Sequence, residues 1–325
     1  MELQLSSDAD VCTGGFISDV LSDLFWRLAM SFDARLLVPG EEAMLDRFLS
    51  PHTPFAFFMR SNLEKEGLRY EGRPCQADYF GAFKDGTLVG ALAHSWLGNV
   101  QVFAEDLASI PSLVEAFRAH RAAVPRRIDA FNGPAEAVRV FWDSVGLPFE
   151  DLRLGLSKAG LFSLTLKDMV LPPLLSNGSV RLRSAEPQDA ELLSLWRYHF
   201  YVEAGNAPAD EKTREEATID ILRCLDEKAL FVLEDGGELV ASCGINGFLT
   251  DWVNVGPVWT PPEIRGRGYG RAVTAGALER ARQCGRTQAS LVAVRPDAEK
   301  IYRDIGFDRI GDWIFDFLKT PVDRL

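Results

Sequence analysis

The chain repeats one pattern in its two halves, and this repeat limits the folds that it can adopt. Residues 80–93 predict a strand, an Asp-Gly turn at 85–86 and a second strand, and residues 230–243 predict the same around an Asp-Gly pair at 235–236. An Asp-Gly pair between two apolar runs is typical of a β-hairpin. The two turns lie 150 residues apart, and each hairpin precedes a further strand, a helix, a short strand and another helix. Because this downstream order is shared, we favour two tandem domains over a chance similarity of two hairpins.

The length of the chain fits two domains, since 325 residues are enough for two ordinary cores. Helix and strand breakers gather between residues 167 and 178, where two adjacent prolines precede a Ser-Asn-Gly turn. We therefore expect a first domain over residues 1–170, with an extra helix at its start, and a second domain over residues 178–325.

Hydrophobic periodicity places the remaining elements. The predicted helix over 16–30 has an acidic polar face, which favours packing over membrane anchoring. The first half also predicts helices over 40–49 and 109–122 and strands over 99–104 and 128–131. The second half predicts strands over 180–183, 254–260, 288–294 and 313–318, and helices from about 190, over 210–227, from the glycine-rich turn to about 284, and over 297–305. For the first two of these helices we expect Asp189 as N-cap and these residues inward: Leu192, Leu193, Leu195, Trp196, Ile219, Ile221, Leu222 and Leu225.

A glycine-rich, arginine-rich turn joins the strand over 254–260 to the following helix. Glycines allow a close approach of the backbone to a ligand, and a helix N-terminus attracts anions. The sequence contains no Walker loop. It does not match the Gly-x-Gly-x-x-Gly fingerprint either, because Arg271 stands where the third glycine would be. The turn therefore predicts a phosphate site, with arginines adding charge. Its members are Arg265, Gly266, Arg267, Gly268, Tyr269, Gly270 and Arg271.

This turn resembles the diphosphate loop of the Gcn5-related N-acetyltransferase (GNAT) family, Gln/Arg-x-x-Gly-x-Gly/Ala. The resemblance implies an α/β fold in each half, with a mixed, mostly antiparallel twisted sheet flanked by helices. It also implies that acetyl-coenzyme A is the cofactor, held at the turn and along the main chain of Val258, Trp259 and Thr260. In the family, strand four pairs with the pantetheine arm, and backbone N–H groups polarise the thioester carbonyl where strands four and five separate.

A second segment, residues 295–307, resembles the family motif Asn-x-x-Ala-x-x-x-Tyr-x-x-x-Gly-Phe. Ala298, Tyr302, Gly306 and Phe307 match it, whereas Arg295 stands at the Asn position. The resemblance implies that Tyr302 protonates the departing coenzyme A sulfur, and a phenol suits that task because it is protonated at neutral pH. The plainer interpretation of Tyr302 is a core aromatic residue. Candidates for the base that deprotonates the amine are Glu203, which we favour, and Asp251 and Glu263.

The first half lacks such a turn. After its strand over 99–104 come Glu105 and Asp106, with no glycine or arginine, and two carboxylates oppose a diphosphate. We therefore expect a degenerate first domain that shapes the cleft and covers the substrate side of the second.

Composition excludes several other classes of protein. A net charge of −12 disfavours nucleic acid and anionic membranes as partners, and the longest apolar runs are too short to span a bilayer. Five dispersed cysteines and four scattered histidines predict reduced thiols, a cytoplasmic protein and no metal site.

Together these features predict an acetyl-CoA-dependent N-acetyltransferase that acts on a small-molecule or peptide amine by direct attack in a ternary complex, as a monomer or weak homodimer. A non-catalytic module that binds or senses acyl-CoA is the alternative, and a longer acyl donor also remains open.

Overall fold

The computed structural model describes residues 32–147, 152–154, 157–205 and 207–323. The predicted helix over 16–30 lies outside this part of the chain. The first half contains β1 (Asp33–Leu36), α2 (Glu42–Leu49), α3 (Thr53–Glu66), β2 (Ala77–Lys84), β3 (Thr87–Ser95), β4 (Asn99–Ala104), α4 (Ile110–Ala123), β5 (Ile128–Pro134), α5 (Ala135–Val145) and β6 (Ser157–Thr165).

The second half repeats this order after the short helix α7 (Pro173–Ser176). It contains β7 (Arg181–Ser184), α8 (Ala190–Ala204), α9 (Glu211–Asp226), β8 (Leu230–Asp235), β9 (Glu238–Phe248), β10 (Trp252–Trp259), α10 (Tyr269–Gln283), β11 (Gln288–Ala293), α11 (Pro296–Ile305) and β12 (Asp308–Val322). The sequence did not predict β1 or α3, and β12 is longer than expected.

One sheet of twelve strands runs through both lobes of the molecule, in the order β1-β2-β3-β4-β5-β12-β6-β11-β10-β9-β8-β7. Only β4 with β5 and β10 with β11 pair in parallel, and the other neighbours pair in antiparallel fashion. The mixed, mostly antiparallel fold class predicted from the sequence is therefore confirmed.

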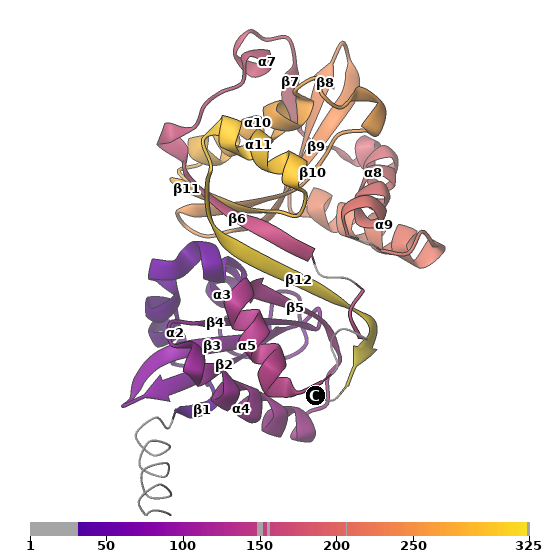
Figure 1. Ribbon diagram of the computed structural model, residues 1–325. Coiled ribbons are helices and arrows are strands. Elements are labelled where there is room, and N and C mark those ends of the chain that lie inside the picture. The colour runs from indigo at the N-terminus through magenta and orange to yellow at the C-terminus, as the bar shows by residue number, and fades with distance from the viewer. Residues whose placement is uncertain (1–31, 148–151, 155–156, 206, 324–325) are drawn as a thin grey trace, which may run out of the picture.

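The two halves exchange their last strands. The first half ends in β6, which pairs with β11 of the second half, and the second half ends in β12, which pairs with β5 of the first. β6 and β12 also pair with each other, so the middle of the sheet belongs to both halves (Figure 1). The predicted boundary at 167–178 falls after β6 in sequence, whereas the sheet of the second lobe includes that strand.

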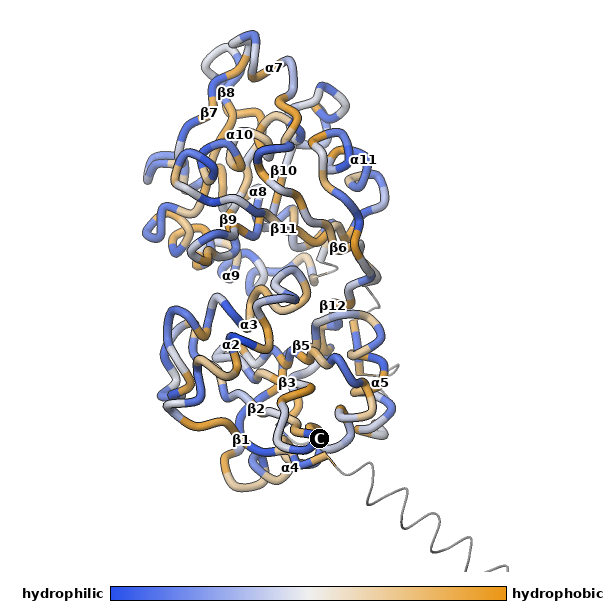
Figure 2. Tube along the Cα trace, turned by 90° about the vertical axis from the view of Figure 1, so that its left-hand side faces the viewer, coloured by the Kyte–Doolittle hydropathy of each residue, from blue (hydrophilic) through white to orange (hydrophobic). Residues whose placement is uncertain are grey.

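Helices cover both faces of each lobe. In the second lobe, α10 and its neighbours bury the largest core over one face, and α8 and α9 bury a smaller cluster over the other. The first-half helix α3 lies at the boundary of the two lobes, near α9 (Figure 2), where Lys65 pairs with Glu227 at 3.7 Å. The first half therefore contributes directly to the surroundings of the second-half sheet.

Two local expectations for α8 and α9 were wrong. Leu193, Trp196, Ile221 and Cys224 are buried, but four other predicted inward residues are 40–67% exposed. The buried residues of the two helices pack together with Leu230, Val232 and Trp259 of the sheet on one narrow face of each helix, and the flanking leucines and isoleucine lie outside that face. The exposed members are Leu192, Leu195, Ile219 and Leu222.

Asp189 does not cap α8 with its side chain. It closes a capping box on the short 3-10 turn Pro187–Asp189 instead, and it accepts two hydrogen bonds from Arg183 at 2.6 and 2.9 Å. The β8–β9 turn also shifts by one residue from the predicted Asp-Gly pair, because Gly236 and Gly237 take φ values of 60° and 92°. Within the described ranges no helix is long and apolar enough to cross a bilayer.

Candidate functional site

The glycine-rich turn opens α10 in the way that anion binding requires. Gly268 is the N-cap residue and has a left-handed φ of 86°, and Gly266 has a φ of 81° with open space where a side chain would be. Within the described part of the chain no side chain caps this helix, and its first turn contains no acidic residue. The first N–H groups of a helix have no partner inside it, so these are free to bind an anion.

The arginines of the turn have different roles. Arg267 is exposed and forms no ion pair with any described residue, so its charge is available. Arg271 lies 3.4 Å from the carboxylate of Asp304 on α11. Tyr269 is buried, and its hydroxyl donates to Asp235 at the end of β8, which ties the turn to the neighbouring hairpin.

Arg265 points away from the open side of the turn. Its Nε donates to the carbonyl of Thr260 at 2.9 Å, and its two Nη atoms donate to Oε1 and Oε2 of Glu203 at 2.7 and 2.8 Å. The guanidinium carbon also lies 4.9 Å from the centre of the Trp259 ring. Arg265 therefore ties the end of β10 to α8.

Glu203, the favoured candidate base, is held by two arginines. Besides Arg265, the guanidinium of Arg295 contacts its Oε1. The hydrogen bond from Arg265, followed by the charges of both arginines, lowers the pKa of Glu203. A carboxylate stabilised in this way is a weaker base than an unpaired one, so the geometry does not favour proton abstraction by Glu203.

The pairing between β10 and β11 ends after three residues. β10 and β11 pair only from Trp252–Gln288 to Asn254–Ser290, and β10 then continues to Trp259 beside β9 alone. The main chain of Val258 and Thr260 thus lies along a gap. The Trp259 side chain packs under α8, with His199 stacked on it at 6.3 Å, so only its main chain faces the gap.

A row of polar side chains marks the last paired position; Asn254 and Ser290 are buried, whereas Asn246 is exposed. Asn246 donates to Asn254 at 2.9 Å, and Asn254 donates to Ser290 at 3.0 Å. Ala289 and Leu291 belong to the core under α10, so the intervening Ser290 faces the opposite side of the sheet. Single Asn and Ser residues in strands give no sequence signal for such a row, because the strand register creates it.

Helix α3 of the first half covers the same face beside this row. A Cβ added to Gly247, which pairs with Asn254, would lie 3.1 Å from the ring of Phe57. Thr250 of the β9–β10 turn also donates to Glu64 of α3 at 3.1 Å. The first half thus closes one side of the region above the gap.

Tyr302 of α11 lies on the other face, among core side chains. Its ring centre is 6.2 Å from that of Phe162 and 6.1 Å from that of Phe307. Burial raises the pKa of Tyr302, and the neighbouring Cys243 thiol and Asp297 carboxylate raise it further. Cys243 belongs to β9, which pairs with β10, and the raised pKa means that the phenol keeps its proton at neutral pH. Among the described residues, its hydroxyl has no hydrogen-bond partner.

The matching position of the first half differs in two ways. Asp106 accepts a hydrogen bond from the N–H of Ala108, so its carboxylate occupies the start of the short 3-10 turn Leu107–Ser109 that precedes α4. A Cβ added to Gly133 of β5 would lie 2.8 Å from the carbonyl oxygen of Val102 on β4, which shows that these strands stay close beyond their last paired position. The first half thus differs from the second both at this turn and in the spacing of its two parallel strands.

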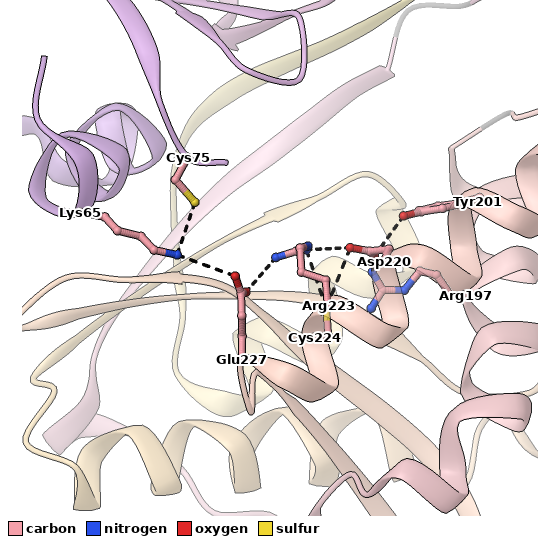
Figure 3. Close-up of polar contacts among 8 residues, drawn as sticks. All are labelled: Lys65, Cys75, Arg197, Tyr201, Asp220, Arg223, Cys224 and Glu227. Carbon is pink, nitrogen blue, oxygen red and sulfur yellow. Dashed lines mark hydrogen bonds and ion pairs between the residues drawn. The ribbon is translucent and has the colours of Figure 1, made fainter. Parts of the chain in front are cut away.

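Contacts with α9 fix the end of α8 that carries Glu203. Arg197 and Tyr201 of α8 both donate to Asp220 of α9, the second at 3.0 Å, and Arg223 donates to the same carboxylate at 2.6 Å (Figure 3). Arg223 continues through Glu227 to Lys65 of α3. This series of hydrogen bonds and ion pairs connects the first half to α8.

Within the described ranges there is no group of three metal-binding side chains. The described cysteines, 75, 224, 243 and 284, are free thiols. The groups found in this part of the second lobe are backbone amides, the Tyr302 phenol, the polar row, and the ion pairs of Glu203 with Arg265 and Arg295.

Comparison with known proteins identifies the second half. Residues 192–307 match the model of the acetyltransferase (GNAT) family. No protein of curated function matches the chain. A GCN5-related N-acetyltransferase from Sphaerobacter thermophilus is 14% identical, with a TM-score of 0.52, over 90% of this chain and 98% of its own.

A Drosophila protein of known structure is 14% identical, with a TM-score of 0.59, over 88% of this chain and 99% of its own. A tandem GNAT protein from clavulanic acid biosynthesis is 12% identical, with a TM-score of 0.48, over 90% and 100% of the two chains. Residues 192–307 thus match a GNAT family domain, and the first half repeats the order of helices and strands of the second without its glycine-rich turn.

Proposed function

We propose that the chain is an N-acetyltransferase that moves the acetyl group of acetyl-CoA to an amine by direct attack in a ternary complex. One observation carries the proposal. The uncapped start of α10, with left-handed Gly266 and Gly268, lies at the end of β10, whose upper part has lost its pairing with β11. An anion site next to unpaired strand backbone fits a ligand that has both a diphosphate and an amide-bearing arm.

The residues present fit acetyl-CoA in chemical terms. The N–H groups of residues 269–271 and the exposed Arg267 would hold the diphosphate. The main chain of Val258 and Thr260 would pair with the pantetheine amides. When bound, acetyl-CoA supplies a thioester, which is an activated acyl group. Residues 258–260 and 265–271 are thus the proposed binding set, with Arg265 and Tyr269 acting through the loop and not by direct contact.

The protein's own groups then supply two contributions. Backbone N–H groups beside the gap polarise a carbonyl, because fixed dipoles in a dry site need no reorganisation. Tyr302 would donate its hydroxyl proton to the departing thiolate sulfur, since its raised pKa keeps the phenol neutral until then. On the opposite face, the acceptor would be an amine of a small molecule or peptide, and Asn246 is the exposed member of the polar row there, whereas Asn254 and Ser290 are buried.

Two further points support the setting of this reaction. Free thiols at the four described cysteines are typical of a reducing compartment such as the cytoplasm. The exchange of β6 and β12 occurs within one chain, so the sheet contacts do not require a second copy, which supports a monomer or a weak homodimer.

Calorimetry with acetyl-CoA, followed by a coenzyme A release assay over a panel of amines, tests the proposal. We expect binding by the wild-type chain, its loss in Arg267→Glu, and no change in the first-half control Glu105→Gln. Binding without coenzyme A release for any amine would favour the acyl-CoA-sensing alternative. Binding retained in Arg267→Glu would contradict the assigned diphosphate site.

A further inference from the structure

Three parts of the proposed site belong to three different elements. The diphosphate turn starts α10, the proton donor Tyr302 belongs to α11, and α8 borders the acceptor face. Glu203, on the last turn of α8, contacts the other two elements through Arg265 and Arg295. Arg295 is the N-cap residue of α11, so one carboxylate connects all three elements.

Each partner is itself fixed to the site. All three nitrogens of Arg265 donate, one to Thr260 at the end of β10 and two to Glu203. Arg295 also donates twice to Asp297 in the first turn of α11, at 3.0 and 2.7 Å. Bidentate guanidinium–carboxylate pairs fix orientation as well as distance, so a movement of Glu203 would release both the turn and the α11 start.

The position of Glu203 is also well defined. Arg197 and Tyr201, on the preceding turns of α8, are tied to Asp220 (Figure 3). Tyr201 also accepts hydrogen bonds at its carbonyl from the N–H groups of Gly205 and Ala207, at 3.1 and 3.0 Å. The Glu203 carboxylate therefore projects from an end of α8 that is held in place by these hydrogen bonds.

We propose that Glu203 is a positioning residue that holds the diphosphate turn and the helix of Tyr302 in register with α8, and that it is not the base. This inference rests on the proposed function. The carboxylate stays ionised and paired at neutral pH, and its removal loosens the turn that receives the diphosphate.

Two variants test the inference, with the acetyl-CoA dissociation constant measured by calorimetry and kcat measured between pH 6 and 9. For Glu203→Gln we expect about tenfold weaker acetyl-CoA binding, which corresponds to the loss of one charge-assisted contact, and an unchanged shape of the kcat–pH profile. Arg265→Lys keeps the positive charge but loses the bidentate hydrogen bonding to Glu203, so it should weaken acetyl-CoA binding to a similar extent. The double variant should bind no more weakly than Glu203→Gln alone, because that substitution already removes the carboxylate that pairs with Arg265.

Glu216→Gln on the exposed side of α9 is the matched control and should bind as the wild type does. A base role gives the opposite pattern, in which Glu203→Gln keeps its affinity, lowers kcat about 100-fold and removes the acidic limb of the profile. That pattern, or full additivity of the two substitutions, overturns the inference. If Glu203→Gln fails to fold, the acetyl-CoA dissociation constant of Arg265→Lys tests the inference instead. Failure of the wild-type chain to bind acetyl-CoA would instead refute the proposed function.

Discussion

Gly268 and Gly270 stand two residues apart in the diphosphate turn, yet the structure predicts opposite effects for alanine at the two positions. Gly268 has a φ of 86°, and an added Cβ would lie 3.3 Å from Cδ1 of Leu174. An L-residue in the left-handed region costs about 1–2 kcal/mol, and the close contact adds to this. We expect Gly268→Ala to lower the free energy of unfolding by about 1–2 kcal/mol.

Gly270 lies inside the first turn of α10, at a φ outside the left-handed region. An added Cβ would meet Oγ1 of Thr260 at 3.5 Å and Cδ1 of Ile301 at 3.9 Å, which are ordinary contacts. Alanine is the better helix former by about 0.5–1 kcal/mol. We expect Gly270→Ala to raise the free energy of unfolding slightly.

The same pair of variants separates acetyl-CoA affinity from stability. If Gly268→Ala relieves its strain by rotating the turn, one N–H group no longer faces the diphosphate, which costs about 1.5–3 kcal/mol, or about 10- to 100-fold in affinity. Gly270→Ala leaves the open side of the turn unchanged, so we expect a change below about threefold. Urea unfolding and titration calorimetry measure both quantities, and equal affinities of the two variants would refute the argument.

Three other predictions follow from the structure. Tyr302→Phe should lower kcat at least ~10-fold with little change in acetyl-CoA affinity, and an unchanged kcat in a folded variant would reject the phenol as acid. Burial, with the nearby charge of Arg126, lowers the pKa of His94 to about 3. Below about pH 6.5 the unfolded chain therefore binds a proton at His94, whereas His94 of the folded chain stays neutral. The contribution of this group to the free energy of unfolding falls as the pH drops. We expect a loss of about 2 kcal/mol between pH 7 and 5 that His94→Gln removes, as seen by urea unfolding; the same loss in the variant would exclude His94. A fragment of residues 178–325 lacks β6 and should unfold or aggregate, whereas a fragment of residues 155–325 should be better folded. Circular dichroism measures the difference, and equal folding of the two fragments would contradict a role for β6 in the second core.

The sequence was most informative where local chemistry decides the structure. The two hairpins, the helices α9 and α11, and the glycine-rich start of α10 are all set by residues within a few positions of each other, and each element is present, although the buried face of α9 and the β8–β9 turn differ in detail. The tandem repeat was visible for the same reason, since both halves carry the same order of local signals.

Other features were hidden because distant parts of the chain create them. The exchange of β6 and β12 depends on pairing between residues such as Leu291 and Phe162, which are far apart in sequence. Helix α3 contains non-helical backbone at Ala56 and a weak apolar stripe, so it gave no clear periodicity, although it covers the sheet beside Asn254.

The site shows the same division. Spacing located Tyr302 and the glycines, but it could not show that Arg265 faces Glu203 and not the open side of the turn. A conserved-looking motif position does not reveal the direction of its side chain, and here the neighbouring Thr260 carbonyl and the α8 carboxylate decide it. The carboxylate chosen as base from the sequence is, in the structure, the partner of two arginines.

The central claim is that the start of α10 holds the diphosphate of acetyl-CoA and thereby sets the thioester sulfur beside Tyr302. A crystal structure of the chain with acetyl-CoA tests this most directly. The account predicts phosphate oxygens within hydrogen-bond distance of the N–H groups of residues 269–271, and the sulfur next to the Tyr302 hydroxyl. Acetyl-CoA bound elsewhere, or a turn with no ligand at a saturating concentration, would contradict it.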